Sequence, residues 1–152
     1  MKIIKSLPLS IFILLSLGGC AKKVTMEKIP TTHITFGSGG GFTNLVTEYI
    51  LLEDGKIVKK SKEAERYDII TRISKDKAAQ CYAGVKVLKL DSLQFNEPGN
   101  MYYFVTIKKD DKTENRIVWG STDTPAPAAI KNFHKLLLSF LPKKNEKEDV
   151  KK

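Results

Sequence analysis

Cys81 and the two histidines, His33 and His134, are the side chains most able to do nucleophilic or acid–base chemistry in this sequence. A thiol becomes a nucleophile when a nearby base or cation favours its thiolate. A histidine beside Cys81 would supply that base, and the chain would then be a thiol-dependent or other hydrolytic enzyme. Cys81, however, lies among apolar residues at helical spacing, which favours a small buried hydrophobe. We therefore predict no catalytic residue and keep a Cys81-dependent enzyme as the alternative.

Other patterns of polar residues do not indicate a site. The two histidines are far apart in the sequence, and neither has Cys, Asp or Glu at metal-ligand spacing. His134 lies beside the apolar side of the last predicted helix, which indicates a residue at the boundary of the core. Acidic pairs such as Glu53-Asp54 and Asp110-Asp111 fall in predicted turns, where water solvates their carboxylates. We expect no metal site and no cofactor.

A glycine-rich segment, Gly37-Ser38-Gly39-Gly40-Gly41, is the most conspicuous local feature. Consecutive glycine N–H groups can bind an anion or let a partner's backbone approach closely. Phe42-Thr43-Asn44 follows in place of the Gly-Lys-Ser/Thr ending and helix of a phosphate-binding loop, so neither that loop nor a dinucleotide fingerprint fits. We interpret the segment as a loop or bulge between strands. Its candidate partner-binding residues are Gly39, Gly40, Gly41 and Phe42.

Cys20 points to covalent attachment of lipid. The chain opens with Lys2 and Lys5, continues through the apolar residues 7–17 and closes on Leu17-Gly18-Gly19-Cys20, which is the order of an export signal. An apolar stretch of about eleven residues is shorter than the roughly twenty that a transmembrane helix needs. The last four residues resemble the lipobox of bacterial lipoproteins. The resemblance implies that residues 1–19 are a signal peptide, that cleavage precedes Cys20, and that its sulfur and usually its amine are acylated.

Acylation of Cys20 would place the protein on a membrane. Each buried methylene contributes about 0.8 kcal/mol, so two or three acyl chains anchor a protein almost permanently. Ala21 and Lys22 follow in place of the acidic residue that can retain lipoproteins in the inner membrane. We expect a lipid-anchored protein of the bacterial cell envelope, at the outer membrane in a cell that has one. The alternative is an ordinary secretory signal whose cleavage site contains a cysteine.

The composition indicates one basic domain without a disulfide. The net charge of +9 falls to +7 when Lys2 and Lys5 leave with the signal. This balance suits anionic headgroups or simple solubility, but the cations are mixed with acidic residues and not interleaved with aromatic ones, so we expect no nucleic-acid binding. With Cys20 acylated, Cys81 has no partner for an internal disulfide.

Hydrophobic periodicity and turn signals predict an α+β fold. A flexible tether over residues 20–31 precedes a single domain over 32–142, and a charged, disordered tail over 143–152 follows it. Asp54-Gly55 predicts a tight hairpin turn, and Ser74 a helix N-cap. Strands joined by short links, with two one-sided helices, predict an antiparallel sheet of about six strands with both helices packed on one face. The expected strands cover residues 33–36, 42–52, 56–60, 66–73, 101–107 and 115–120. One expected helix follows Ser74, and Thr124-Pro125-Ala126-Pro127 opens the other.

Trp119, the single tryptophan, lies at the end of the strand 115–120, and Tyr103 and Phe104 belong to the strand before it. We interpret it as part of the sheet core, with an aromatic recognition surface as the alternative.

The order of these features resembles a known family. Gly39-Gly40-Gly41-Phe42, an alternating strand, the strand that begins Asn100-Met101-Tyr102-Tyr103-Phe104, a second strand and a Leu-rich terminal helix resemble emfourin, a small proteinaceous inhibitor of thermolysin-like metalloproteases. The resemblance covers roughly residues 33–141. The chain also resembles small lipoproteins of the bacterial envelope with the same Gly-rich start. Departures from emfourin are the lipoprotein signal and Asn44, where Gly or Ala is expected. The resemblance implies a protease-binding loop, so we expect a non-catalytic protein-binding module whose partner is a protein such as a secreted protease.

Overall fold

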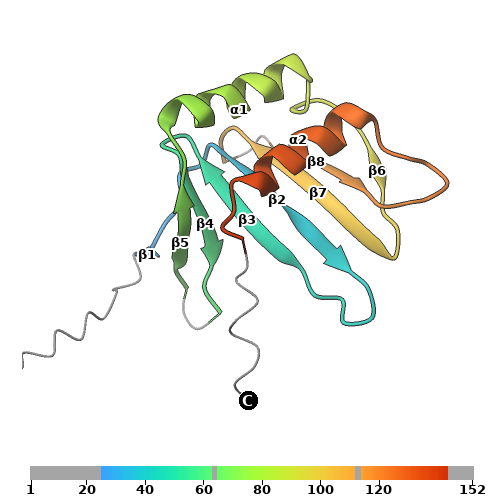
Figure 1. The fold of residues 1–152 in the computed structure, drawn as a ribbon, viewed down its shortest axis with the longest axis horizontal. Coiled ribbons are helices and arrows are strands. Elements are labelled where there is room, and N and C mark those ends of the chain that lie inside the picture. Colours follow the sequence, from blue (N-terminus) through green and yellow to red (C-terminus); the bar gives the residue numbers. More distant parts are fainter. Residues whose placement is uncertain (1–24, 63–64, 112–113, 144–152) are drawn as a thin grey trace, which may run out of the picture.

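The computed structural model describes residues 25–62, 65–111 and 114–143 of the 152-residue chain. These residues form an α+β fold with two helices and an eight-stranded, mostly antiparallel sheet (Figure 1). The predicted signal peptide, Cys20 and the tail beyond Lys143 lie outside the described residues.

Along the described residues, five strands precede α1, and three more strands lie between α1 and α2. The sheet order is β1-β5-β4-β3-β2-β7-β8-β6, so β2 and β3 lie in the middle. The strands are β1 (Thr25–Met26), β2 (His33–Gly40), β3 (Thr47–Leu52), β4 (Lys56–Lys60), β5 (Tyr67–Arg72), β6 (Asn96–Glu97), β7 (Met101–Lys108) and β8 (Glu114–Trp119), and the helices are α1 (Lys75–Val87) and α2 (Ala128–Ser139).

The sheet differs from the predicted one at both edges. Instead of about six antiparallel strands it has eight, because the two-residue strands β1 and β6 extend it, and β6 runs parallel to β8. Strands this short carry no periodic pattern, so sequence reasoning could not find them. β1 lies inside the segment predicted as a tether and pairs with Tyr67 and Asp68 of β5.

The glycine-rich segment is mostly strand, which corrects its interpretation as a loop or bulge. Residues 37–40 belong to β2, between β3 and β7. Aromatic rings of β7 occupy space that side chains would fill, and at Gly37 the backbone of β3 does so as well. A Cβ atom on Gly37 would lie 2.0 Å from the Thr47 carbonyl oxygen. A Cβ atom on Gly37 would lie 3.0 Å from Cζ of Phe104, and one on Gly39 would lie 2.5 Å from the Tyr102 hydroxyl. The expected second strand accordingly begins at Thr47 and not at Phe42.

Both helices cover the same face of the sheet (Figure 1), as predicted. The core between them and the sheet contains Ala78, Cys81, Val85, Ile130, Phe133 and Leu137 of the helices and Ile34, Phe36, Leu51, Ile57, Val105, Ile107, Ile117 and Trp119 of the strands. A smaller cluster on the opposite face consists of Ile50, Leu52 and Val58, with Met26, Ile29, Tyr67 and Ile69 against it. Burial of the larger core is what holds the helices to the sheet.

Two local predictions are confirmed. β3 and β4 form a hairpin in which Asp54 accepts a hydrogen bond from the Lys56 N–H at 3.1 Å, and Gly55 has a φ of +85°. Ser74 caps α1, since its side chain accepts a hydrogen bond from the Lys77 N–H. These features depend on neighbouring residues alone, which is why the sequence reveals them.

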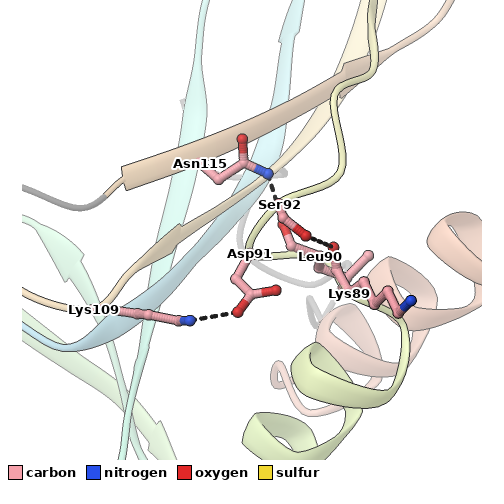
Figure 2. Close-up of polar contacts among 6 residues, drawn as sticks. All are labelled: Lys89, Leu90, Asp91, Ser92, Lys109 and Asn115. Carbon is pink, nitrogen blue, oxygen red and sulfur yellow. Dashed lines mark hydrogen bonds and ion pairs between the residues drawn. The ribbon is translucent and has the colours of Figure 1, made fainter.

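Polar contacts hold the segment after α1 against the ends of β7 and β8 (Figure 2). The Asn115 side chain donates to the carbonyl oxygens of Leu90, at 2.7 Å, and Leu93, at 2.9 Å. Lys109 forms an ion pair with Asp91, and the Ser92 hydroxyl donates to the carbonyl of Lys89. These contacts hold residues 89–93, which follow α1, against the sheet.

Candidate functional site

The turn between β2 and β3, residues 41–46, presents apolar side chains to solvent. We call it the apolar turn. Phe42 is fully exposed, Leu45 is 71% exposed, and Val46 is about half exposed. Single exposed apolar residues are ordinary on protein surfaces, but several together mark an interaction site.

One backbone hydrogen bond joins the apolar turn to the residue before β7, and a second closes the turn on itself. The N–H of Gly41 donates to the carbonyl of Asn100 at 2.7 Å, and the N–H of Asn44 donates to the carbonyl of Gly41 at 3.1 Å. Gly41 has a φ of +72°, a left-handed conformation that glycine adopts without the strain of other residues. The turn therefore holds Phe42 at its tip in a defined conformation.

The four candidate partner-binding residues fall on both sides of the strand end. Gly39 and Gly40 are in β2, opposite Tyr102 and Met101 of β7, whereas Gly41 and Phe42 are in the apolar turn. Sequence reasoning missed the residues that extend the exposed apolar surface. These are Leu45, Val46 and, on β7, Met101 and Tyr103. Met101 lies against Gly41, where a Cβ atom would meet its sulfur at 2.9 Å.

Tyr103, Trp119 and His134 form an aromatic cluster where α2 crosses the ends of β7 and β8. The rings of Tyr103 and Trp119 are stacked with centroids 6.0 Å apart. The His134 ring is edge-on to Trp119 at 5.1 Å and to Tyr103 at 5.7 Å. Trp119 is buried, so the interpretation as sheet core is confirmed.

The prediction of His134 as a boundary residue is wrong. It is only 4% exposed, and its Nε2 lies 3.1 Å from the Gly37 carbonyl oxygen. A carbonyl can only accept, so Nε2–H is the donor. Burial lowers the pKa of His134, although the hydrogen bond to Gly37 opposes this effect. The side chain joins α2 to β2 just before the strand reaches the apolar turn.

Beside this cluster is a pocket of about 290 Å³, which we call the aromatic pocket. The spacing of Lys131, Lys135 and Leu138 places them on one side of α2. That spacing was visible in the sequence, but the rings that complete the pocket come from two other elements. Its lining residues are Tyr103, Trp119, Lys131, His134, Lys135 and Leu138.

The residues considered for catalysis are not arranged for it. Cys81 is buried in the main core, and burial raises the pKa of its thiol, which disfavours the thiolate at neutral pH. His33 donates from Nδ1 to the carbonyl of Pro30 at 2.7 Å. These findings favour the interpretation of Cys81 as a buried hydrophobe and count against its use as a nucleophile.

Within residues 25–62, 65–111 and 114–143, no three His, Cys, Asp or Glu side chains are grouped so that they could hold a metal ion. No helix in the same residues is long and apolar enough to cross a membrane. In comparisons with known proteins, no family model matches the chain and no curated protein matches it.

Proposed function

We propose that this chain is a lipid-anchored, non-catalytic protein-binding module of the bacterial cell envelope, and that it binds its partner through the apolar turn. The observation that carries the proposal is the complete exposure of Phe42 at the tip of a turn whose Leu45 and Val46 are also exposed. Burying a phenylalanine side chain stabilises by about 1.5–3 kcal/mol, and that burial is available here only in a complex.

The conformation of the turn supports a binding role. Its Gly41 and Asn44 hydrogen bonds restrain the backbone before any partner arrives. A binding loop that is ordered in the free protein loses less conformational entropy on association, so more of the contact energy appears as affinity. Aromatic residues at the centre of an interface usually contribute most of that affinity.

The partner that we propose is a secreted metalloprotease of the thermolysin-like class. The resemblance of residues 33–141 to emfourin supports it, with Gly39, Gly40, Gly41 and Phe42 in the contact region. An anchor on Cys20 would keep the module at the membrane surface, where secreted proteases pass.

The test is binding and inhibition of a thermolysin-like metalloprotease by the full chain in lipid vesicles. Phe42→Ser should weaken binding by about 30-fold, which corresponds to a hot-spot contribution of about 2 kcal/mol. Val87→Ser is the matched control, because Val87 is 79% exposed but lies on α1. Equal affinity of the two variants would remove the apolar turn from the interface. A wild-type chain that does not bind the protease would exclude this partner.

The anchor is tested separately with Cys20→Ser. We expect this variant to lose incorporation of labelled palmitate and to leave the membrane fraction, because the acylated sulfur is absent. Cys81→Ser should retain both and is the control. Palmitate labelling that survives in Cys20→Ser would contradict the lipoprotein assignment.

A further inference from the structure

We infer that the aromatic pocket binds an aromatic side chain of the partner protein that has an acidic residue next to it in sequence. The inference rests on the proposed protein-binding function and adds the chemistry of the partner segment. It is carried by the rings, the charges and the position of the pocket.

The rings of the pocket provide a surface for another ring. Tyr103 stacks on Trp119 with an interplanar angle of 28°, while His134 is perpendicular to Trp119 at 89°. Trp119 and His134 are buried, but Tyr103 is 41% exposed and leaves part of its ring open. Aromatic pairs gain stability in stacked and edge-to-face arrangements beyond the area that they bury. An aromatic side chain from a partner could therefore extend the stack.

The charges of the pocket are all positive. Lys131 and Lys135 are exposed on adjacent turns of α2, and the helix sequence AAIKNFHKLLLS contains no acidic residue. Neither lysine forms an ion pair with any residue in the part of the chain that the structure describes. A carboxylate beside the bound ring would meet both ammonium groups, which favours an acidic neighbour in the partner segment.

The volume and position of the pocket suit one side chain of a longer segment. About 290 Å³ is at the lower limit for a ligand pocket. Met101 and Tyr103 lie two residues apart on the same face of β7, and so about 7 Å apart along the strand. Met101 is about half exposed and lies against Gly41 of the apolar turn, so exposed apolar side chains are present both in that turn and on β7 beside the pocket. One extended segment of the partner can reach both.

Trp119 makes the test direct, because it is the only tryptophan of the chain. The full chain, in phosphatidylcholine vesicles, is titrated with N-acetyl-Phe-Asp-amide while Trp119 emission is recorded. We expect a saturable change in emission. N-acetyl-Phe-Asn-amide should bind at least threefold more weakly, and N-acetyl-Ala-Asp-amide should show no saturation. Equilibrium dialysis of the same peptides provides a readout that does not depend on tryptophan emission.

Variants separate the two parts of the recognition. Lys131→Gln combined with Lys135→Gln should reduce the affinity for Phe-Asp to that for Phe-Asn and leave the latter unchanged. Leu138→Gln should weaken both Phe peptides. Leu136→Gln should weaken neither, because Leu136 is 46% exposed on the same helix but outside the pocket.

Three outcomes would overturn the inference: no saturable binding by either readout, equal affinity for Phe-Asp and Phe-Asn, or equal effects of Leu136→Gln and Leu138→Gln. Its failure is distinguishable from failure of the proposed function. If Phe42→Ser loses the protease while no variant changes peptide binding, the function stands and the pocket inference fails. If the peptide results hold but Phe42→Ser binds the protease normally, the apolar turn is not the protease-binding site and the pocket inference stands.

Discussion

The two ends of β3 reverse the chain in different ways. At one end, Asp54 and Gly55 make a tight polar turn in which the Asp54 carboxylate accepts from the Lys56 N–H and the Gly55 carbonyl accepts from the N–H of Ile73 at 2.9 Å. At the other end, the apolar turn is longer and exposes Phe42 and Leu45. Both turns contain a glycine with positive φ, Gly41 and Gly55, so a left-handed glycine alone does not distinguish them.

The two turns differ in what their side chains do: Phe42 and Leu45 extend into solvent, whereas Asp54 makes a hydrogen bond within its turn. A polar sequence would connect β2 to β3 at least as well, because the fold makes no use of the Phe42 side chain. In the β3–β4 turn, by contrast, the Asp54 carboxylate and the Gly55 carbonyl both accept hydrogen bonds from the backbone. This contrast supports the proposal that the apolar turn serves binding, whereas the β3–β4 turn contributes hydrogen bonds to the fold.

The largest effect should come from a bulky residue at Gly55. A Cβ atom there would lie 2.3 Å from the Ile73 carbonyl oxygen and would also require the left-handed conformation. We expect Gly55→Val to lower the free energy of unfolding by about 3 kcal/mol, measured by urea denaturation. Gly41→Val should lower it by only about 1–2 kcal/mol, because the nearest atom is the flexible Met101 sulfur at 2.9 Å. Equal losses would mean that the two turns are equally integrated into the fold.

A smaller effect should appear as a pH dependence of the free energy of unfolding, caused by His134, which contacts Gly37 of β2. Because burial lowers the pKa of His134 in the folded state, the unfolded chain binds this proton first as the pH falls below about 6.5. Stability from this residue is therefore complete above that pH and is lost toward acid, with a slope of at most about 1.4 kcal/mol per pH unit.

The control is His134→Gln, which retains a donor for the Gly37 carbonyl but does not titrate. Urea denaturation between pH 7 and pH 5 should show a shallower decline for this variant than for the wild-type chain. Identical pH profiles would show that His134 does not couple protonation to the packing of α2 on β2.

The smallest effect should come from Phe42 itself. Since its side chain is fully exposed, Phe42→Ser should change the free energy of unfolding by no more than about 0.5 kcal/mol. Thermal and urea denaturation of the purified variant would measure this. A loss of 2 kcal/mol would assign Phe42 to the fold and weaken the contrast between the two turns.

Sequence reasoning predicted the parts of the fold whose signals are local. The hairpin at Asp54-Gly55 and the N-cap at Ser74 depend on a few adjacent residues, and both are observed. The glycine-rich segment was misread because Gly37 and Gly39 leave room for the rings of Phe104 and Tyr102, which lie more than sixty residues later in the chain, and Gly37 also for the Thr47 carbonyl oxygen. Propensity alone disfavours glycine in a strand, and cross-strand packing overrides it here.

For the candidate site, the sequence by itself determined which short segments could be modified or contact a partner. Without a fold, one can recognise that residues 17–20 resemble a lipobox and that Gly39 to Phe42 are candidate contact residues. Only the tertiary structure decided that Tyr103, Trp119 and His134 meet, because the register of β7 on β8 and the crossing of α2 bring them together. Contacts between distant residues depend on packing of the whole core, which no short window of sequence contains.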